Sequence, residues 1–173
     1  LFRSPPHPRV GSPAGRRQPG ARHLQALREI AQSHLGLGDR AAYLRAMREV
    51  ERVFRERRLA LDGPAAPFVA EAVFVELDAR VGALLRAPPA PAEVLRARLD
   101  AIDRALWAVE RVRDAHVVAA SYRVGQAFEH AAERLRDPSL RRRAIERYVG
   151  AVHASQSSGA PSLFADAARS RLR

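Results

Sequence analysis

Apolar residues recur at steps of three and four from about residue 22 onward, and this spacing limits what the chain can fold into. The clearest stripe consists of Leu95, Leu99, Ile102, Leu106 and Val109. Such steps place side chains on one face of an α-helix, whereas a half-buried strand needs strict alternation of apolar and polar residues. No segment alternates convincingly. The sequence therefore predicts an all-α fold.

Glycine and proline punctuate this pattern at short intervals, most clearly at Gly36–Gly38, Asp62–Pro64, Pro88–Pro91 and Asp137–Ser139. The sequence does not decide whether a bend near His116 separates a fourth helix from a fifth. Helices joined by short turns become antiparallel neighbours, so we expect stacked antiparallel helical hairpins resembling an α-solenoid. The expected helices cover residues 22–35, 39–61, 67–86, 92–114, 117–136, 139–154 and 162–172.

The chain divides into an extended Arg/Pro/Gly arm at residues 1–20, a helical-hairpin domain at 21–154, and a flexible link with a short helix at 155–173. The arm contains no acid, which is typical of organellar targeting segments. However, five prolines prevent the amphipathic helix of such a segment, so we expect a retained arm that only a partner orders. These prolines are Pro5, Pro6, Pro8, Pro13 and Pro19.

One pair of expected helices resembles a tetratricopeptide hairpin. Its first helix has an aromatic, small, aromatic series, and its second a small, aromatic, small series. These residues are Tyr122, Gly125, Phe128, Ala144, Tyr148 and Ala151. Within one tetratricopeptide repeat of roughly 34 residues, the corresponding small residues of the two helices lie closer together in sequence than Gly125 and Ala144 do. Generic hairpin packing therefore remains the alternative. The resemblance implies a stack of helical hairpins that serves protein–protein contact.

The chain of 173 residues has a net charge of +11, and all thirty of its basic residues are arginine. Residues 1–61 carry +8, residues 62–133 carry −3 and residues 134–173 carry +6. GC-rich coding would replace lysine by arginine without selection, but it does not explain the net charge. Alternatively, the planar guanidinium suits bidentate phosphate contacts. If the two basic ends converge in the fold, they would form one positive surface.

The sequence lacks the motifs of the common catalytic sites. It has no cysteine, no His-Glu-x-x-His zinc motif and no phosphate-binding glycine loop between a strand and a helix. His130 lies between Glu129 and Glu133, which is more typical of a surface ion pair than of catalysis. We therefore expect no enzyme, no cofactor, no metal and no small-molecule substrate. No apolar run is long enough for a transmembrane segment.

Six arginines gather around the expected turn at Asp137-Pro138. We predict that these six, together with four arginines of the arm, bind RNA or another anion. The backbone amides of Ser139 and Leu140 would add donors for a phosphate. A second stripe, Arg45, Arg48, Arg52 and Arg55, is partly neutralised by neighbouring glutamates. The predicted binding residues are Arg3, Arg9, Arg16, Arg17, Arg134, Arg136, Arg141, Arg142, Arg143 and Arg147.

Aromatic residues make up 6% of the chain, too few for base stacking along a single strand. Trp107 is expected at the edge of the core. Contact with RNA would therefore be directed at phosphates and independent of sequence. The composition resembles that of mitochondrial ribosomal proteins, which implies a non-catalytic subunit that contacts ribosomal RNA and protein neighbours in the mitochondrion. The alternative is a tetratricopeptide-like scaffold subunit of a mitochondrial or bacterial membrane energy complex.

Overall fold

The computed structural model describes residues 19–112, 116–159 and 161–173, and every regular element in these ranges is an α-helix. The predicted all-α class is confirmed for this part of the chain. Most of the expected arm, with Arg3, Arg9, Arg16 and Arg17, lies outside the described residues. The helices are α1 (Pro19–Gly36), α2 (Arg40–Glu56), α3 (Ala66–Arg86), α4 (Ala92–Val112), α5 (His116–Leu135), α6 (Pro138–Ser158) and α7 (Leu163–Arg171).

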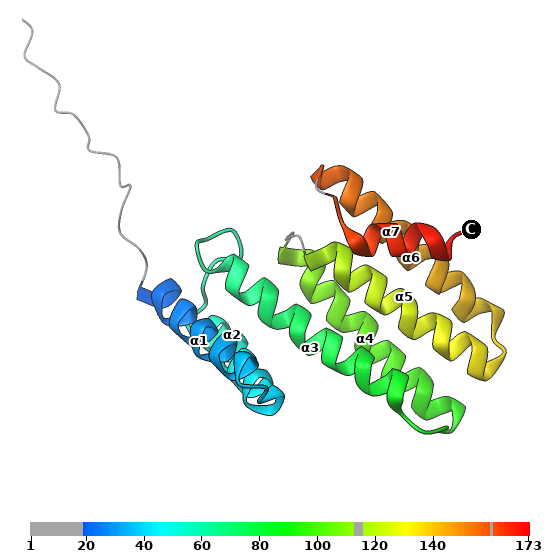
Figure 1. Ribbon diagram of the computed structural model, residues 1–173, viewed down its shortest axis with the longest axis horizontal. Coiled ribbons are helices and arrows are strands. Elements are labelled where there is room, and N and C mark those ends of the chain that lie inside the picture. The colour runs from blue at the N-terminus through cyan, green and yellow to red at the C-terminus, as the bar shows by residue number, and fades with distance from the viewer. Residues whose placement is uncertain (1–18, 113–115, 160) are drawn as a thin grey trace, which may run out of the picture.

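Consecutive helices run back and forth as hairpins that lie side by side (Figure 1). The hairpins are α1–α2, α3–α4 and α5–α6, and α7 packs on both α5 and α6. Helix α3 also packs on α1 and α5, so the odd-numbered helices form a continuous layer. The even-numbered helices α2, α4 and α6 make no direct backbone contact with one another. This is a stack of helical hairpins, as the short turns predict.

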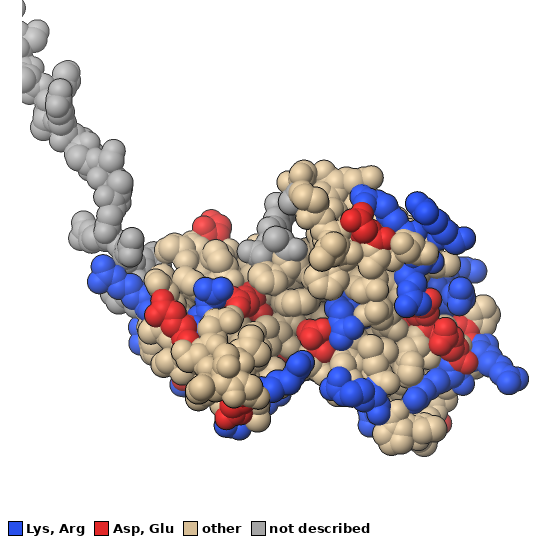
Figure 2. Space-filling view, viewed as in Figure 1, with Lys and Arg blue, Asp and Glu red and all other residues tan. Residues whose placement is uncertain are grey.

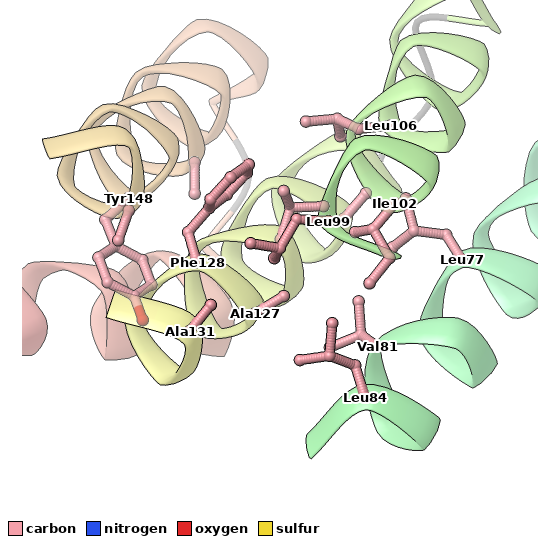
Figure 3. Close-up of a cluster of buried hydrophobic side chains, with 14 of the residues drawn as sticks. Leu77, Val81, Leu84, Leu99, Ile102, Leu106, Ala127, Phe128, Ala131 and Tyr148 are labelled. Carbon is pink, nitrogen blue, oxygen red and sulfur yellow. The ribbon is translucent and has the colours of Figure 1, made fainter. Parts of the chain in front are cut away.

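Two apolar clusters hold the stack together, and α3 joins them. The smaller cluster contains Met47, Val50 and Phe54 of α2 packed against α1 and the first half of α3. The larger cluster extends from the second half of α3 to α7. At its centre, side chains from α3, α4, α5 and α6 converge, as Figure 3 shows. The labelled residues are Leu77, Val81, Leu84, Leu99, Ile102, Leu106, Ala127, Phe128, Ala131 and Tyr148.

Local capping explains where several helices begin and end. The Asp39 carboxylate accepts a hydrogen bond from the Ala42 amide at 2.8 Å, which caps α2. Helix α2 ends at Glu56 rather than at residue 61, because Arg58 takes a left-handed conformation with φ of 48°. Helix α6 continues to Ser158, where the left-handed Gly159 ends it. The flexible link expected at 155–161 is therefore helical over 155–158, and α1 begins at Pro19, not at residue 22.

Three large apolar side chains do not lie where their spacing placed them. Ile30 and Ile145, each three residues from an apolar neighbour on the same helix (Leu27 and Tyr148), are about half exposed. Trp107, expected at the edge of the core, is 67% exposed on α4. The reason is that the adjacent helices cover a narrower strip of each helix than the apolar spacing alone indicates.

Candidate anion-binding surface

The turn between α3 and α4 lies beside the turn between α5 and α6 at one end of the stack (Figure 1). Arg134 of α5 donates to the backbone oxygen of Ala87 at 3.0 Å. Arg96 of α4 donates to the carboxylate of Asp137 at 3.1 Å. These two contacts join segments more than 40 residues apart in the chain.

We call the surface around these turns the basic end. It is formed by six exposed arginines: Arg86, Arg96, Arg134, Arg136, Arg141 and Arg142. The acids near the same helix ends are Glu93, Glu133 and Asp137. In Figure 2, arginine side chains gather on the side of the molecule where the two turns lie. The arrangement leaves the basic end with a net positive charge.

Only part of the predicted arginine cluster faces solvent here. Arg143 and Arg147 turn instead toward α4, where both donate to the carboxylate of Asp103, at 2.9 and 2.6 Å. The Arg143 guanidinium also lies 4.2 Å from the centre of the Phe128 ring, close enough for a cation–π contact. Arg147 and Arg143 therefore stabilise the packing of α6 beside α4 and are unsuited to a ligand.

The remaining predicted residues divide into one structural arginine and three unpaired ones. Arg134 binds the backbone of the α3–α4 turn, as described above. Arg136, Arg141 and Arg142 have no acidic partner within the described ranges. Arg136 and Arg141 line a shallow hollow of about 250 Å³ together with Glu133 and Asp137. Among the described residues, these three arginines are the part of the predicted site that can still bind an anion.

Two of the three unpaired arginines occupy positions that are unfavourable for folding. Arg136 has φ of 51°, a left-handed conformation that costs a non-glycine residue about 1–2 kcal/mol. Arg141 lies in the first turn of α6, which contains no acid after the Asp137 N-cap, and Arg142 lies in the second turn. The amino-terminal end of a helix is partly positive over its first turn, so a cation at Arg141 is unfavourable. No ion pair within the described residues accounts for arginine at these positions.

The structure does not support the expectation that the backbone amides at the start of α6 donate hydrogen bonds to a phosphate. The Asp137 carboxylate caps the helix by accepting hydrogen bonds from the Ser139 amide at 2.9 Å and from the Ser139 hydroxyl at 2.6 Å. These bonds, with the neighbouring Arg96 guanidinium, hold the pKa of Asp137 below its ordinary value. The Ser139 amide is thus already occupied by an ionised carboxylate. A phosphate at this end would be bound by guanidinium groups.

The second predicted stripe, on α2, is largely neutralised. Arg48 pairs with Glu76 of α3, Arg52 pairs with Glu49 and Glu56, and Arg55 pairs with Glu51. Arg45 alone among the four has no ion pair in the described part of the chain. The glutamates interleaved in the sequence indicated this outcome.

Sequence spacing missed two members of the basic end, Arg86 and Arg96. They lie 51 and 41 residues before Asp137 and belong to the other hairpin. A charge count along the chain assigns them to the mildly acidic middle segment. Only the pairing of the two turns in the stack brings them beside Arg136 and Arg141.

Residues 19–112, 116–159 and 161–173 contain neither a candidate metal site nor a candidate membrane-spanning helix. No group of three or more His, Asp or Glu side chains could hold a metal ion there. No helix in these ranges is long and apolar enough to cross a membrane. Glu129 binds Tyr148 and Arg171 rather than His130, whose Nε2 atom is buried without a hydrogen-bond partner.

Comparison with known proteins gives no match: no family model, no curated protein and no solved structure is similar to this chain.

Proposed function

We propose that this chain is a non-catalytic structural subunit of a large ribonucleoprotein assembly. Its basic end would bind RNA phosphates, and its α-solenoid-like hairpin body would contact neighbouring proteins. Of the assemblies with such subunits, we favour an organellar, mitochondrial ribosome, because the arginine-rich composition resembles that of its proteins. The arm at residues 1–20 would follow the RNA through Arg3, Arg9, Arg16 and Arg17.

One observation carries this proposal. Arg136, Arg141 and Arg142 lie at the basic end without acidic partners among the described residues. The backbone conformation disfavours Arg136, and the helix dipole disfavours Arg141. A bound phosphate would relieve both the mutual repulsion and the unfavourable helix-end charge. Arginine binds phosphate with two parallel hydrogen bonds, which makes these side chains suitable donors.

The expected binding mode is phosphate contact without base recognition. The basic end offers guanidinium groups but no aromatic platform, since its hollow is lined by Ala132, Glu133, Arg136, Asp137, Pro138 and Arg141. Such contacts position a protein on RNA and do not read its sequence. Affinity should therefore fall steeply with salt and vary little among structured RNAs.

Binding of the purified chain to a structured RNA and to poly-glutamate, each titrated over a range of salt concentrations, tests this proposal. We expect RNA to bind at least tenfold more tightly than poly-glutamate of equal charge, because bidentate phosphate contacts favour RNA. Equal or tighter binding of poly-glutamate would contradict the proposal, since the surface would then prefer acidic protein.

A protein scaffold remains the second candidate, and the exposed Trp107 favours it. A tryptophan that is 67% exposed on a helix is unusual for a free surface and typical of the anchors of protein interfaces. In this case the chain would be a tetratricopeptide-like subunit of a mitochondrial or bacterial membrane energy complex. RNA binding that is no tighter than poly-glutamate binding would favour this candidate.

A further inference from the structure

A groove runs along α3 and α4 on the side of the even-numbered helices. It consists of two adjoining hollows of about 420 and 250 Å³ that share Arg80 and Ala101. In the larger hollow, Leu84 and Ile102 form the floor and three alanines form the walls. These alanines are Ala83, Ala87 and Ala101. The smaller hollow continues toward α2, where Glu51 forms part of its edge.

The equivalent gap between α4 and α6 is closed, which makes the open groove between α2 and α4 distinctive. Asp103 and Glu110 of α4 bind Arg143 and Arg147 of α6, and Arg96 binds Asp137. Within the described residues, no ion pair joins α2 to α4. The two gaps occupy corresponding places in the hairpin stack, but side chains fill only one of them.

The charge of the groove between α2 and α4 indicates what kind of partner would occupy it. The larger hollow is lined by five apolar residues and two arginines, Arg80 and Arg98, and by no acid. Arg98 is exposed and has no acidic partner in the part of the chain that the structure describes. Arg104, likewise unpaired there, lines the smaller hollow, whose lining also contains Glu51 and Glu76, both already paired with arginines. The two arginines without partners would attract carboxylates on an occupant with an apolar face.

The shape of the groove fits a helix. Small alanine walls allow the backbone of a partner to approach closely, and a helix presents apolar side chains at steps of three and four to such a floor. The groove follows α3 from Val73 to Ala87, which at 1.5 Å per residue is a length of about 21 Å. A helix of about four turns would fill it.

We propose that this groove binds an acidic amphipathic helix of a neighbouring protein. Leucine-sized side chains of that helix would pack on Leu84 and Ile102, and its carboxylates would pair with Arg98 and Arg104. This inference rests on the proposed function, in which the hairpin body contacts neighbouring proteins, and it names the surface and the kind of partner for one such contact. It does not involve the basic end, so the two can fail separately.

Trp107, the single tryptophan of the chain, is exposed on α4 but lies outside the lining of both hollows. Binding is therefore read from the fluorescence anisotropy of a dye-labelled probe. The probe is a synthetic 18-residue peptide without aromatic residues, with leucine on one face, glutamate on the opposite face and alanine between.

Titrating the dye-labelled peptide with the full chain should raise its fluorescence anisotropy along a saturable curve. A peptide with lysine in place of glutamate, and one with the leucines scattered around the helix, should bind at least tenfold more weakly. In the chain, A83E and R98E should each weaken binding of the glutamate peptide at least tenfold. The matched controls A26E and R45E, at exposed positions outside the groove, should leave binding unchanged.

Three results would overturn the proposal. In the first, the lysine peptide binds as well as the glutamate peptide, or A83E and R98E bind like their controls. In the second, structured RNA displaces the peptide from the wild-type chain but not from A83E, which would make the groove an RNA surface. In the third, the chain alone forms a dimer that A83E disrupts, which would make a second copy the occupant. None of these results bears on whether the basic end binds RNA.

Discussion

The ring of Tyr148 on α6 packs directly against the backbone of Gly125 on α5: a Cβ atom added to the glycine would lie 2.6 Å from Cε1 of the tyrosine. Tyr148 is only 1% exposed. Its hydroxyl donates to Glu129 at 2.8 Å, and Arg171 of α7 binds the same carboxylate at 3.0 Å. Burial and the Glu129 carboxylate together raise the pKa of Tyr148. The contact therefore organises the last three helices.

Replacing Gly125 by alanine should destabilise the fold despite the better helix propensity of alanine. Overpacking against a buried ring costs about 1–3 kcal/mol, whereas the propensity gain is about 1 kcal/mol. We expect a net loss of about 1 kcal/mol in the free energy of unfolding, measured by urea denaturation. The matched control is G150A on α6, where an added Cβ meets nothing within 4 Å. It should be neutral or stabilising, and a stabilised G125A would contradict the close packing.

Asp103 binds Arg143 and Arg147 across the gap between α4 and α6. The variant D103N should lower the free energy of unfolding by about 1 kcal/mol, since it leaves two partly covered guanidinium groups without their carboxylate. Asp100, on the same helix and without an ion pair in the described ranges, supplies the control. D100N should change stability by less than about 0.5 kcal/mol. Equal effects of the two variants in urea denaturation would argue against the bridge.

The spacing of apolar residues predicts the helices but not how one helix packs on another. A local signal such as the stripe from Leu95 to Val109 depends on neighbours within one or two turns, and this prediction is confirmed. The partners of Arg143 and Arg147 lie 40 and 44 residues away, and the Ala87 oxygen that Arg134 binds lies 47 residues away. These contacts depend on how hairpins stack, which no local spacing encodes. For this reason three of the predicted anion-binding residues proved to be structural.

Stability should fall on mild acidification because of His130. Burial, with the nearby Arg134 cation, lowers the pKa of His130 below its ordinary value, while Glu133 opposes the shift. The unfolded chain therefore binds a proton at higher pH than the folded chain does. Stability from this residue is present above about pH 6.5 and is lost as the pH falls from there to the folded-state pKa.

The variant H130F tests this account, since its ring cannot take up a proton and its position lacks a hydrogen-bond partner for Nε2. Thermal unfolding between pH 7.5 and 5 should show a smaller loss of stability for H130F than for the wild type. H153F, at an exposed position on α6, should keep the wild-type pH dependence. An unchanged profile for H130F would exclude His130 as the source.

The arginines at the basic end should reduce stability in the absence of a ligand. R141Q removes a cation from the first turn of α6, where it costs about 0.3–1 kcal/mol at low ionic strength, and R142Q removes one from the second turn, where little effect is expected. R136G relieves the left-handed conformation of Arg136, which costs a non-glycine residue about 1–2 kcal/mol, offset in part by the greater freedom of glycine in the unfolded chain. The triple variant should therefore unfold at a higher urea concentration than the wild type. A clearly destabilised variant would show that these side chains support the fold.

The most direct test of the proposed function is the salt dependence of RNA binding by this triple variant, R136G/R141Q/R142Q. The control removes three exposed arginines from other surfaces, as R45Q/R57Q/R104Q. Each lost phosphate contact should reduce the slope of log K against log salt by about 0.9 on duplex RNA, taking the value for duplex DNA, so three contacts reduce it by about 2.7. We predict this reduction for the basic-end variant and little change for the control. Equal slopes for the two variants would contradict the claim that the basic end binds RNA.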